Sequence, residues 1–451
     1  MQYSIIQKSQ LEGVQRLDAE YYQPEFLETK NRLLSVPHFV LGDHAFITDG
    51  EHGSAEFVND GIKFLTAENI QEGFINNSGV RFVSEEVDKR NKRASLLTKD
   101  IVISIKGTVG LAGIAFNDDL PANMNRDVSR IHVKNKINPY YLVAFLNSKL
   151  GKNQTLRESS GNVQQMTTLG RLRELLIPKV PDSFSSKIEQ FINDSRNALN
   201  DSQNLYQQAE NFLLVESGLA DFKPKGDLSF VVNLSDVKSA NRIDADYFQP
   251  KYEKLVAKIK SRNEKRLEEF VASYSTGFPY KSENYQEDGT PLIRINNIKK
   301  GFIDLNDTAY LSERDYSLSP KDTARPGDIV LSMSGTIGMS AVIPGDVPKC
   351  SVNQRILKFS PKDIDPDLLV LILNSVIGGY QLERIGTGGV QTNISYKDIQ
   401  NILIPVLPKG TQQKIADLVI KSHEARKKSK ELLEEAKRKV EEMIEKGNTE
   451  S

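Results

Sequence analysis

The feature that most constrains this chain is an internal repeat with an offset of 226 to 228 residues. Residues 16–24 (RLDAEYYQP) match residues 242–250 (RIDADYFQP). Further pairs follow in the same order: Asn69-Ile70 with Asn297-Ile298, residues 100–102 with 328–330, 107–110 (GTVG) with 335–338 (GTIG), 146–148 with 373–375, and 177–178 with 404–405. This many ordered matches predict two globular units of similar fold, each roughly 180 residues long.

Each globular unit is followed by a segment with the apolar spacing of a coiled-coil helix. Apolar or small residues recur there at steps of three and four, and both segments carry serine at two matching positions. Small residues at these positions allow the backbones of two helices to approach closely. We therefore predict that the two helices form an antiparallel pair that acts as a spacer. The seam residues are Ile188, Phe191, Ser195, Ala198, Ser202, Leu205, Ala209 and Phe212 in the first helix, and Ile415, Leu418, Ser422, Ala425, Ser429, Leu432, Ala436 and Val440 in the second.

The expected fold class is α+β. It consists of two similar mixed α/β globular domains joined by a long antiparallel two-helix coiled coil, with pseudo-two-fold symmetry. The predicted segments are a first domain over residues 1–181, a helix over 182–221, a second domain over 222–408, a helix over 409–447 and a frayed tail over 448–451.

Proline and asparagine or aspartate mark the helix starts within each unit. Pro24 and Pro250 predict helices that run to about Leu34 and Lys260. Asn138-Pro139 and Asp365-Pro366 predict helices that end near Gly151 and Gly378. Strands are expected over residues 101–105 and 329–333, and a final strand in each unit is expected to end at 177–178 and 404–405.

Composition limits the class of protein. The chain has 451 residues, 38% of them hydrophobic, without a run of about 18 apolar residues, which predicts a globular protein with no transmembrane helix. The first residues lack a signal-peptide pattern. The single cysteine, Cys350, excludes an internal disulfide and fits the cytoplasm. A net charge of −1 predicts weak DNA affinity for the chain alone.

Signs of catalytic chemistry are few. The sequence has no phosphate-binding Walker loop, no dinucleotide fingerprint and no Asn- or Asp-Pro-Pro-aromatic motif of an adenine methyltransferase. Residues 49–52 (DGEH) are the one cluster that resembles a metal or general-base site, and a polar loop is the favoured interpretation. The Gly-Thr-x-Gly turns could bind phosphate through backbone N–H groups or could be tight turns. Gln164 and Gln391 could contact DNA or could cap a short helix.

Together these features resemble the specificity subunit of Type I restriction–modification systems. The resemblance covers nearly the whole chain. It rests on residues 18–24 and their copy, the strand that leads into Gly-Thr-x-Gly, and the Gly-x-x-Gln loop before Ile404-Pro405 and the long helix. Lys106 provides the basic residue found before that turn in many relatives, whereas the second half has Met333 and Ser334 there.

The resemblance implies that residues 1–181 and 222–408 are target recognition domains, each recognising one half of a split double-stranded DNA sequence. It implies that the helices set the gap and dock two modification (methyltransferase) subunits, which use S-adenosylmethionine, and that restriction (motor–nuclease) subunits join with ATP and Mg²⁺. The chain itself is then non-catalytic and carries no cofactor or metal. A helix of about 30 to 35 residues spans roughly 45 to 50 Å, so it can hold two domains about one DNA turn of 34 to 36 Å apart, or slightly more.

Positions that differ between the repeats, within otherwise similar surroundings, are the candidates for base contacts. Arginine pairs with guanine, asparagine and glutamine with adenine, and glutamate with cytosine. The predicted base contacts are His52, Glu68, Arg294, Asn296, Gln164 and Gln391. The predicted phosphate contacts are Arg81, Lys89, Arg90, Lys92, Arg93, Lys106, Lys281, Lys299 and Lys300.

Two other classes stay open from the sequence alone. One is a stand-alone DNA-acting enzyme, a nuclease or methyltransferase, which would need a carboxylate set or a cofactor pocket. The other is a two-domain scaffold that binds protein or sugar.

Overall fold

The computed structural model describes residues 4–7, 11, 17–53, 55–134, 136–159, 165–224, 226–347, 349–386 and 394–447. They form two compact units. Unit 1 comprises residues 1–199 and 427–451, and unit 2 comprises residues 200–426. Both boundaries fall inside long helices, so each unit contains one globular domain and a part of both helices. The end of the chain therefore belongs to the same unit as its beginning.

Unit 1 is built on two sheets. The larger has the order β2-β10-β7-β8-β5, antiparallel except for the parallel pair β5–β8, and the smaller has the order β3-β6-β4-β9. A separate pair joins β1 to β11. The strands are β1 (His38–Val40), β2 (Ala45–Asp49), β3 (Phe57–Val58), β4 (Ile62–Leu65), β5 (Gly73–Phe74), β6 (Arg81–Val83), β7 (Ile101–Ser104), β8 (Ala112–Ile114), β9 (Ala122–Met124), β10 (Val128–Val133) and β11 (Leu176–Pro178).

Unit 2 repeats this arrangement. Its sheets have the orders β13-β22-β19-β20 and β17-β14-β21-β18, with the pairs β12–β23 and β15–β16 beside them. Both of these sheets have four strands, and the one that contains β14 holds a parallel pair, β14–β21, which matches β4–β9 of unit 1. The strands are β12 (Glu264–Arg266), β13 (Val271–Ser275), β14 (Thr290–Ile293), β15 (Ile298–Lys299), β16 (Phe302–Ile303), β17 (Ala309–Leu311), β18 (Thr323–Ala324), β19 (Ile329–Ser332), β20 (Ser340–Val342), β21 (Cys350–Val352), β22 (Ile356–Pro361) and β23 (Leu403–Pro405).

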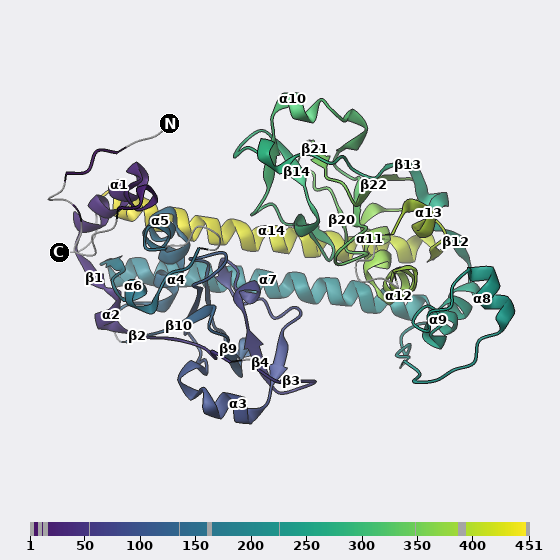
Figure 1. Ribbon diagram of the computed structural model, residues 1–451, viewed down its shortest axis with the longest axis horizontal. Coiled ribbons are helices and arrows are strands. Elements are labelled where there is room, and N and C mark those ends of the chain that lie inside the picture. The colour runs from purple at the N-terminus through teal and green to yellow at the C-terminus, as the bar shows by residue number, and fades with distance from the viewer. Residues whose placement is uncertain are drawn as a thin grey trace. The chain divides into compact units, whose positions relative to one another are not determined.

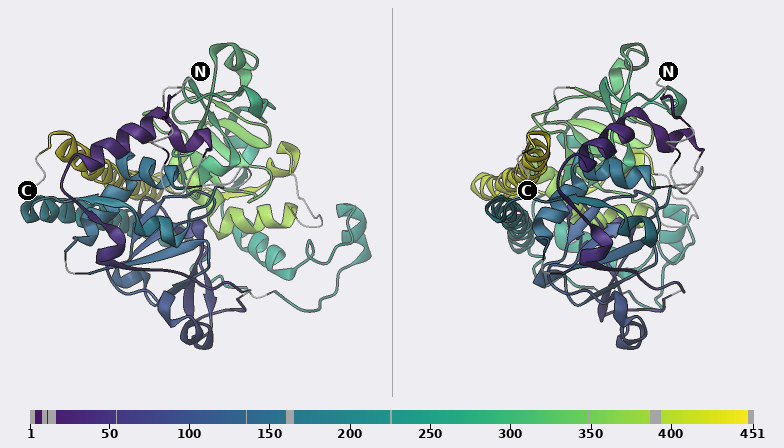
Figure 2. Two further views of the ribbon diagram at one scale, coloured as in Figure 1. Left: turned by 60° about the vertical axis from the view of Figure 1, so that its left-hand side comes forward. Right: turned by 90° about the vertical axis from the view of Figure 1, so that its left-hand side faces the viewer.

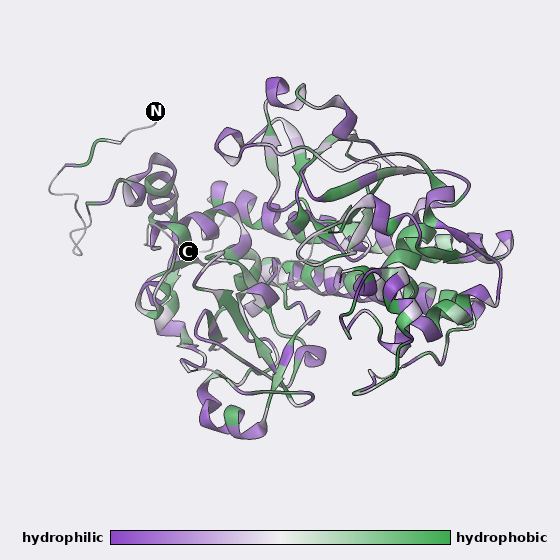
Figure 3. Cartoon of the chain, turned by 45° about the vertical axis from the view of Figure 1, so that its right-hand side comes forward, coloured by the Kyte–Doolittle hydropathy of each residue, from purple (hydrophilic) through white to green (hydrophobic). Residues whose placement is uncertain are grey.

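Helices pack against the sheets of each unit. In unit 1 they are α1 (Pro24–Leu34), α2 (Leu41–His44), α3 (Glu85–Arg90), α4 (Pro139–Asn147), α5 (Lys149–Arg157) and α6 (Leu169–Arg173). In unit 2 they are α8 (Leu234–Ala240), α9 (Pro250–Lys260), α10 (Glu313–Tyr316), α11 (Pro366–Asn374), α12 (Val376–Ile385) and α13 (Tyr396–Ile399). The strands carry much of the hydrophobic colour in Figure 3, as expected for sheets covered by helices.

The predicted helix starts are confirmed, but the helices predicted to end near Gly151 and Gly378 are each two helices, α4 and α5 in unit 1 and α11 and α12 in unit 2. Asn138 caps α4 by accepting from the backbone N–H groups of Tyr140 and Tyr141, and Asp365 caps α11 in the same way. The chain bends at Ser148, which adopts an extended conformation and caps α5 through the N–H of Gly151. A Cβ at Gly151 would lie 2.0 Å from the carbonyl oxygen of Phe145, so the bend requires glycine there.

The long helices are α7 (Asp182–Glu216) and α14 (Lys409–Glu445), and they pack side by side and antiparallel (Figures 1 and 2). In unit 1, Ser195 Oγ donates to the carbonyl oxygen of Ser429 at 2.7 Å. In unit 2, Ser422 Oγ donates to the carbonyl oxygen of Ser202 at 2.7 Å. Buried serines at these crossings replace bulky side chains, which allows the two backbones to approach closely.

Across the described residues, no single helix is long and apolar enough to cross a membrane. The pair α11 and α12, bent by 60° at their junction, meets the length and composition test only when joined.

Candidate nucleic-acid interface

The loop after β2 gathers several of the predicted DNA-contacting residues of unit 1. His52 Nε2 lies 2.7 Å from Asp49 Oδ2, and Arg93 Nη2 lies 3.2 Å from the other oxygen of Asp49. Arg90, at the end of α3, pairs with Glu51 at 3.1 Å. The two carboxylates are mostly buried while the basic side chains are mostly exposed, so the loop presents basic groups to solvent.

Glu51 anchors this loop to α3. A hydrogen bond from the backbone N–H of Gly53, followed by one from Asn91 and the pairing with Arg90, holds the pKa of Glu51 below its ordinary value. A carboxylate that stays charged and is hydrogen-bonded on several sides fixes the position of its partners. This arrangement supports the polar-loop interpretation of residues 49–52. No group of three potential metal ligands occurs among the described residues.

A short 3₁₀ turn presents the remaining candidates in both units. In unit 1 the turn is Ala67–Asn69, where Asn69 Oδ1 accepts from the Thr66 N–H at 2.9 Å and Asn69 Nδ2 donates to the Asn76 carbonyl at 3.1 Å. In unit 2 the turn is Ile295–Asn297, and Asn297 makes the same two kinds of bond at the same places. The buried asparagine thus holds an equivalent platform in each unit.

The exposed side chains on these platforms differ. Glu68 projects from the first turn and Asn296 from the matching position of the second. Arg294 precedes the second turn, and its Nη2 donates to the Asp307 carbonyl oxygen at 2.5 Å. Asn296 Nδ2 donates to the carboxylate of the same Asp307 at 3.1 Å. Asp307 was not among the predicted residues, because nothing in its local spacing marks it.

The Arg294 side chain is only partly satisfied by these contacts. Its Nε is buried and has no hydrogen-bond partner within the described part of the chain. The guanidinium also lies 5.9 Å from the ring centre of Tyr285. An arginine whose charged partner is one highly exposed aspartate can exchange that partner for a base edge, to which its guanidinium N–H groups would donate.

The predicted phosphate contacts are distributed over several surfaces. Arg81 stacks on Phe57 at 3.8 Å, Lys89 pairs with Glu85 at 3.1 Å and Lys106 lies 3.8 Å from Asp127. Lys281 and Lys92 are exposed, and Lys299 is half-buried. Lys300 is directed toward α7, where it pairs with Glu210 at 3.2 Å. Gln164 and Gln391 lie outside the described residues.

The Gly-Thr-x-Gly segments are tight turns. The N–H of Gly110 donates to the Ser104 carbonyl at 2.9 Å, and that of Val109 donates to the Gly107 carbonyl at 3.0 Å. The second unit makes the same two bonds at Gly338 and Ile337. Because these N–H groups are already used within the turn, the geometry favours the structural interpretation over a phosphate site.

Two repeated globular units, each packed on parts of the same two long helices, are typical of a modular two-domain protein. Comparison with known proteins identifies the family. The family described as "Type I restriction modification DNA specificity domain" matches residues 53–211 and 260–436. The chain therefore belongs to this family and carries two copies of its domain. Specificity subunits of this family are non-catalytic and carry no cofactor.

Individual relatives show the same likeness over shorter stretches. The EcoBI specificity subunit of Escherichia coli is 28% identical over 27% of this chain and 26% of its own length. The MjaVIII specificity subunit of Methanocaldococcus jannaschii is 29% identical over 38% of this chain and 42% of its own length. These matches thus span a quarter to less than half of the relatives. The crystal structure of a Type I S subunit from M. genitalium aligns over 91% of this chain and 95% of that one, at 14% identity and a TM-score of 0.42.

Proposed function

We propose that the chain is the DNA sequence-recognition subunit of a Type I restriction–modification complex, in which each unit recognises one half of a bipartite double-stranded target. The observation that carries the proposal is the double family match, joined to two equivalent platforms that present different side chains. A constant platform with variable residues allows one fold to recognise two different half-sites. The base contacts would be made by Glu68, His52, Arg294 and Asn296. The exposed basic residues would contact phosphates.

Selection from a randomised duplex library tests this function. The chain is assembled with its modification subunits, and bound duplexes are recovered and sequenced. The expected result is two short fixed blocks separated by a gap of constant length and random sequence. Recovery of one continuous block, or of no preferred sequence at a salt concentration where binding persists, would contradict the proposal.

The long helices would set the gap and the partners would supply the chemistry. In this proposal two modification subunits dock on the chain and methylate adenine with S-adenosylmethionine, and restriction subunits join them with ATP and Mg²⁺ in the cytoplasm. Matching apolar side chains support docking of two equal partners, because Leu17 in unit 1 and Ile243 in unit 2 are both largely exposed. Exposed apolar residues at the same repeat position in both units favour protein contacts.

Shortening both helices tests the spacer. Removing residues 195–201 and 422–428 deletes one heptad from each helix and leaves one seam serine in each, so the serine pairing is kept. Seven residues correspond to about 10 Å, or roughly three base pairs. The same library selection should then return both half-sites unchanged and a shorter gap. An unaltered gap would refute the spacer.

A further inference from the structure

Each unit completes its core with a helix from the other half of the sequence. The C-terminal part of α14 places Leu433, Ala436, Val440 and Ile444 in the core of unit 1. The C-terminal part of α7 places Ala209 and Leu213 in the core of unit 2. Neither half of the sequence therefore contains all of its own core, and each requires a helix from a partner half.

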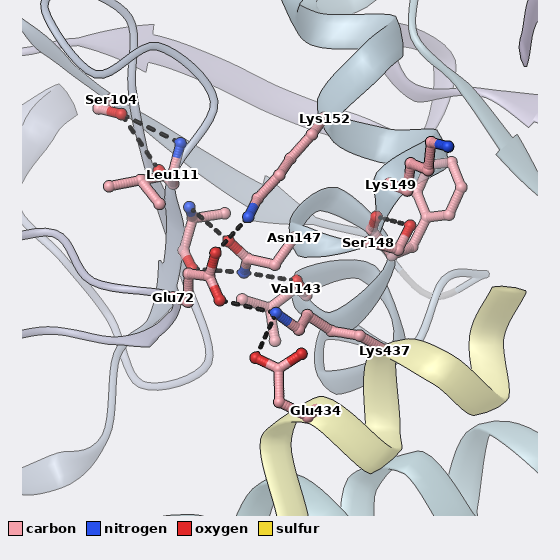
Figure 4. Close-up of polar contacts among 12 residues, drawn as sticks. Glu72, Ser104, Leu111, Val143, Asn147, Ser148, Lys149, Lys152, Glu434 and Lys437 are labelled. Carbon is pink, nitrogen blue, oxygen red and sulfur yellow. Dashed lines mark hydrogen bonds and ion pairs between the residues drawn. The ribbon is translucent and has the colours of Figure 1, made fainter. Parts of the chain in front are cut away.

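In unit 1 this helix is held by a glycine contact and a charge cluster. Gly73 approaches Leu433 so closely that a Cβ would lie 2.8 Å from the leucine side chain. The preceding residue, Glu72, accepts from Lys437 of α14 at 2.7 Å, and Lys437 also pairs with Glu434 at 2.7 Å. Lys152 of α5 reaches the same carboxylate from a different side (Figure 4). Glu72 and Lys437 are both mostly buried, so their charges are poorly screened.

In unit 2 the same positions carry the opposite charges. Gly301 approaches Tyr206 of α7, with a Cβ position 2.8 Å from the ring. The preceding residue, Lys300, pairs with both carboxylate oxygens of Glu210 at 3.2 Å. Lys300 occupies the repeat position of Glu72, and Glu210 that of Lys437. The domain contributes the acid and the helix contributes the base in unit 1, and the reverse holds in unit 2.

This exchange distinguishes the correct pairing of halves from the two incorrect ones. If two first halves paired, Glu72 would meet Glu210, and if two second halves paired, Lys300 would meet Lys437. The apolar positions do not discriminate in this way, because Ala209 and Leu213 correspond to Ala436 and Val440. Like charges at a partly desolvated contact disfavour a complex strongly.

We propose that the charge-exchanged pairs Glu72–Lys437 and Lys300–Glu210 select the partner at this interface, so that a first half binds a second half and not another copy of itself. The pairs would act while the chain folds and would disfavour pairing between the repeated halves of two chains. The inference concerns assembly of the chain and is independent of DNA recognition.

The test starts from the intact chain. A protease site inserted after Pro224 allows the folded protein to be cut into its two halves. The cut protein is unfolded in guanidinium chloride, refolded by dilution and analysed by native mass spectrometry, which resolves the three possible pairs by mass. Random pairing gives the mixed pair and the two self-pairs in the proportion 2:1:1. The proposal predicts an excess of the mixed pair of about tenfold or more over that proportion.

A double variant should reverse the preference. In Glu210→Lys with Lys437→Glu, each self-pair gains opposite charges and the mixed pair places like charges together, so self-pairs should predominate. Adding Glu72→Lys and Lys300→Glu restores opposite charges in the mixed pair and should recover it in part, because Lys152 also lies beside position 72. Lys430→Glu, at an exposed position of α14, is the matched control and should leave the wild-type distribution unchanged.

Each result decides for or against the proposal. Random pairing of the wild-type halves, an unaltered distribution in the double variant, or an equal shift in the Lys430→Glu control would overturn it. If the cut double variant fails to refold, the uncut chain decides. There, Glu72→Lys and Lys437→Glu should each lower the melting temperature, and the combination should be less harmful than the two effects added. Simple additivity in that cycle would overturn the proposal.

Discussion

At the scale of single residues, the candidate base contacts are held ready by interactions within the protein. Asp307 accepts from both Arg294 and Asn296, and its own side chain is 88% exposed. The exposed carboxylate of Asp307 is the acceptor that a base edge would replace, while the Asp307 carbonyl, which also accepts from Asn297 Nδ2 at 3.4 Å, stays part of the turn. Preorganisation of this kind reduces the ordering cost of binding.

Replacing Arg294 with alanine should relax specificity at one base position. Loss of a two-bond contact to a base lowers affinity for the preferred sequence by about 1–3 kcal/mol, or roughly 5- to 150-fold. Competition binding of the assembled complex against half-site variants measures both effects. Lys281 is an exposed cation of the same unit, and Lys281→Ala is the control. It should weaken binding to all sequences alike and reduce the salt dependence of binding. A uniform loss for Arg294→Ala would assign it to the DNA backbone.

Cys350 offers a reporter for unit 2. The thiol is fully buried in β21, and burial raises its pKa to about 12. The native chain should therefore react with iodoacetamide at pH 8 at least about a hundredfold more slowly than the unfolded chain. The thiol of the unfolded chain has an ordinary pKa of about 8.5. Pulsed alkylation with mass detection gives the ratio. Rapid stoichiometric labelling of the native chain would show that the thiol is accessible.

The sequence located these candidates only in part. Comparing the repeats selected Arg294 and Asn296 because they differ from Thr66 and Glu68 at the matching positions. The sequence placed them on a strand, whereas the structure has a 3₁₀ turn there. The sequence could not locate Asp307, since a partner that is 10 or more residues away in a loop leaves no periodic signal. It also predicted Lys300 as a phosphate contact and could not foresee that the side chain pairs with Glu210, because that contact depends on tertiary structure.

At the scale of elements, glycine controls how closely each domain docks on a long helix. Gly73 has a φ of +81° and lies against Leu433, while Gly79 has a φ of +68° with nothing within 4 Å of a Cβ. Both positions favour glycine for conformational reasons, but only Gly73 also needs the space.

Gly73→Ala should therefore destabilise the protein more than Gly79→Ala. Both variants incur a cost of about 1–2 kcal/mol for a side chain at positive φ, and Gly73→Ala adds about 1–3 kcal/mol for crowding against Leu433. Guanidinium unfolding followed by circular dichroism compares them. Equal losses would mean that α14 moves away from Gly73 without resistance.

The contact between Glu72 and Lys437 should make the free energy of unfolding of unit 1 depend on pH in the acid range. Burial raises the pKa of Glu72, but attraction and hydrogen bonds from Lys437 and Lys152 outweigh burial and bring it below its ordinary 4.5. A lowered folded-state pKa stabilises the protein above the unfolded value, and this stability is lost as the pH falls below 4.5 through the folded value. Glu72→Gln should flatten that part of a stability–pH curve. An unchanged slope would show that the pair is uncoupled from folding.

The helix predictions succeeded where local signals act alone. Pro24 and Pro250 open helices that end at Leu34 and Lys260, as the sequence indicated. The heptad pattern located α7 and α14, but it missed part of the face that packs on the globular domains. Ile192, Leu213 and Leu433 lie one position from the predicted seam and pack into the globular cores, because each helix contacts a domain as well as its partner.

At the scale of the whole molecule, the repeat was the most informative property of the sequence. Repetition predicted two units of one fold, and the matching strand orders confirm it. The exchange of helices between the halves could not be foreseen from order along the chain, because Leu433 and Val440 are distant in sequence from the unit 1 core that they complete.

The most direct test of the central claim is a genome-wide map of N6-methyladenine in cells that carry the modification subunits, with and without this chain. Two-part recognition predicts a methylated motif of two fixed blocks with a constant gap, present only when the chain is present. A methylation pattern that persists without the chain, or a single uninterrupted motif, would contradict the account.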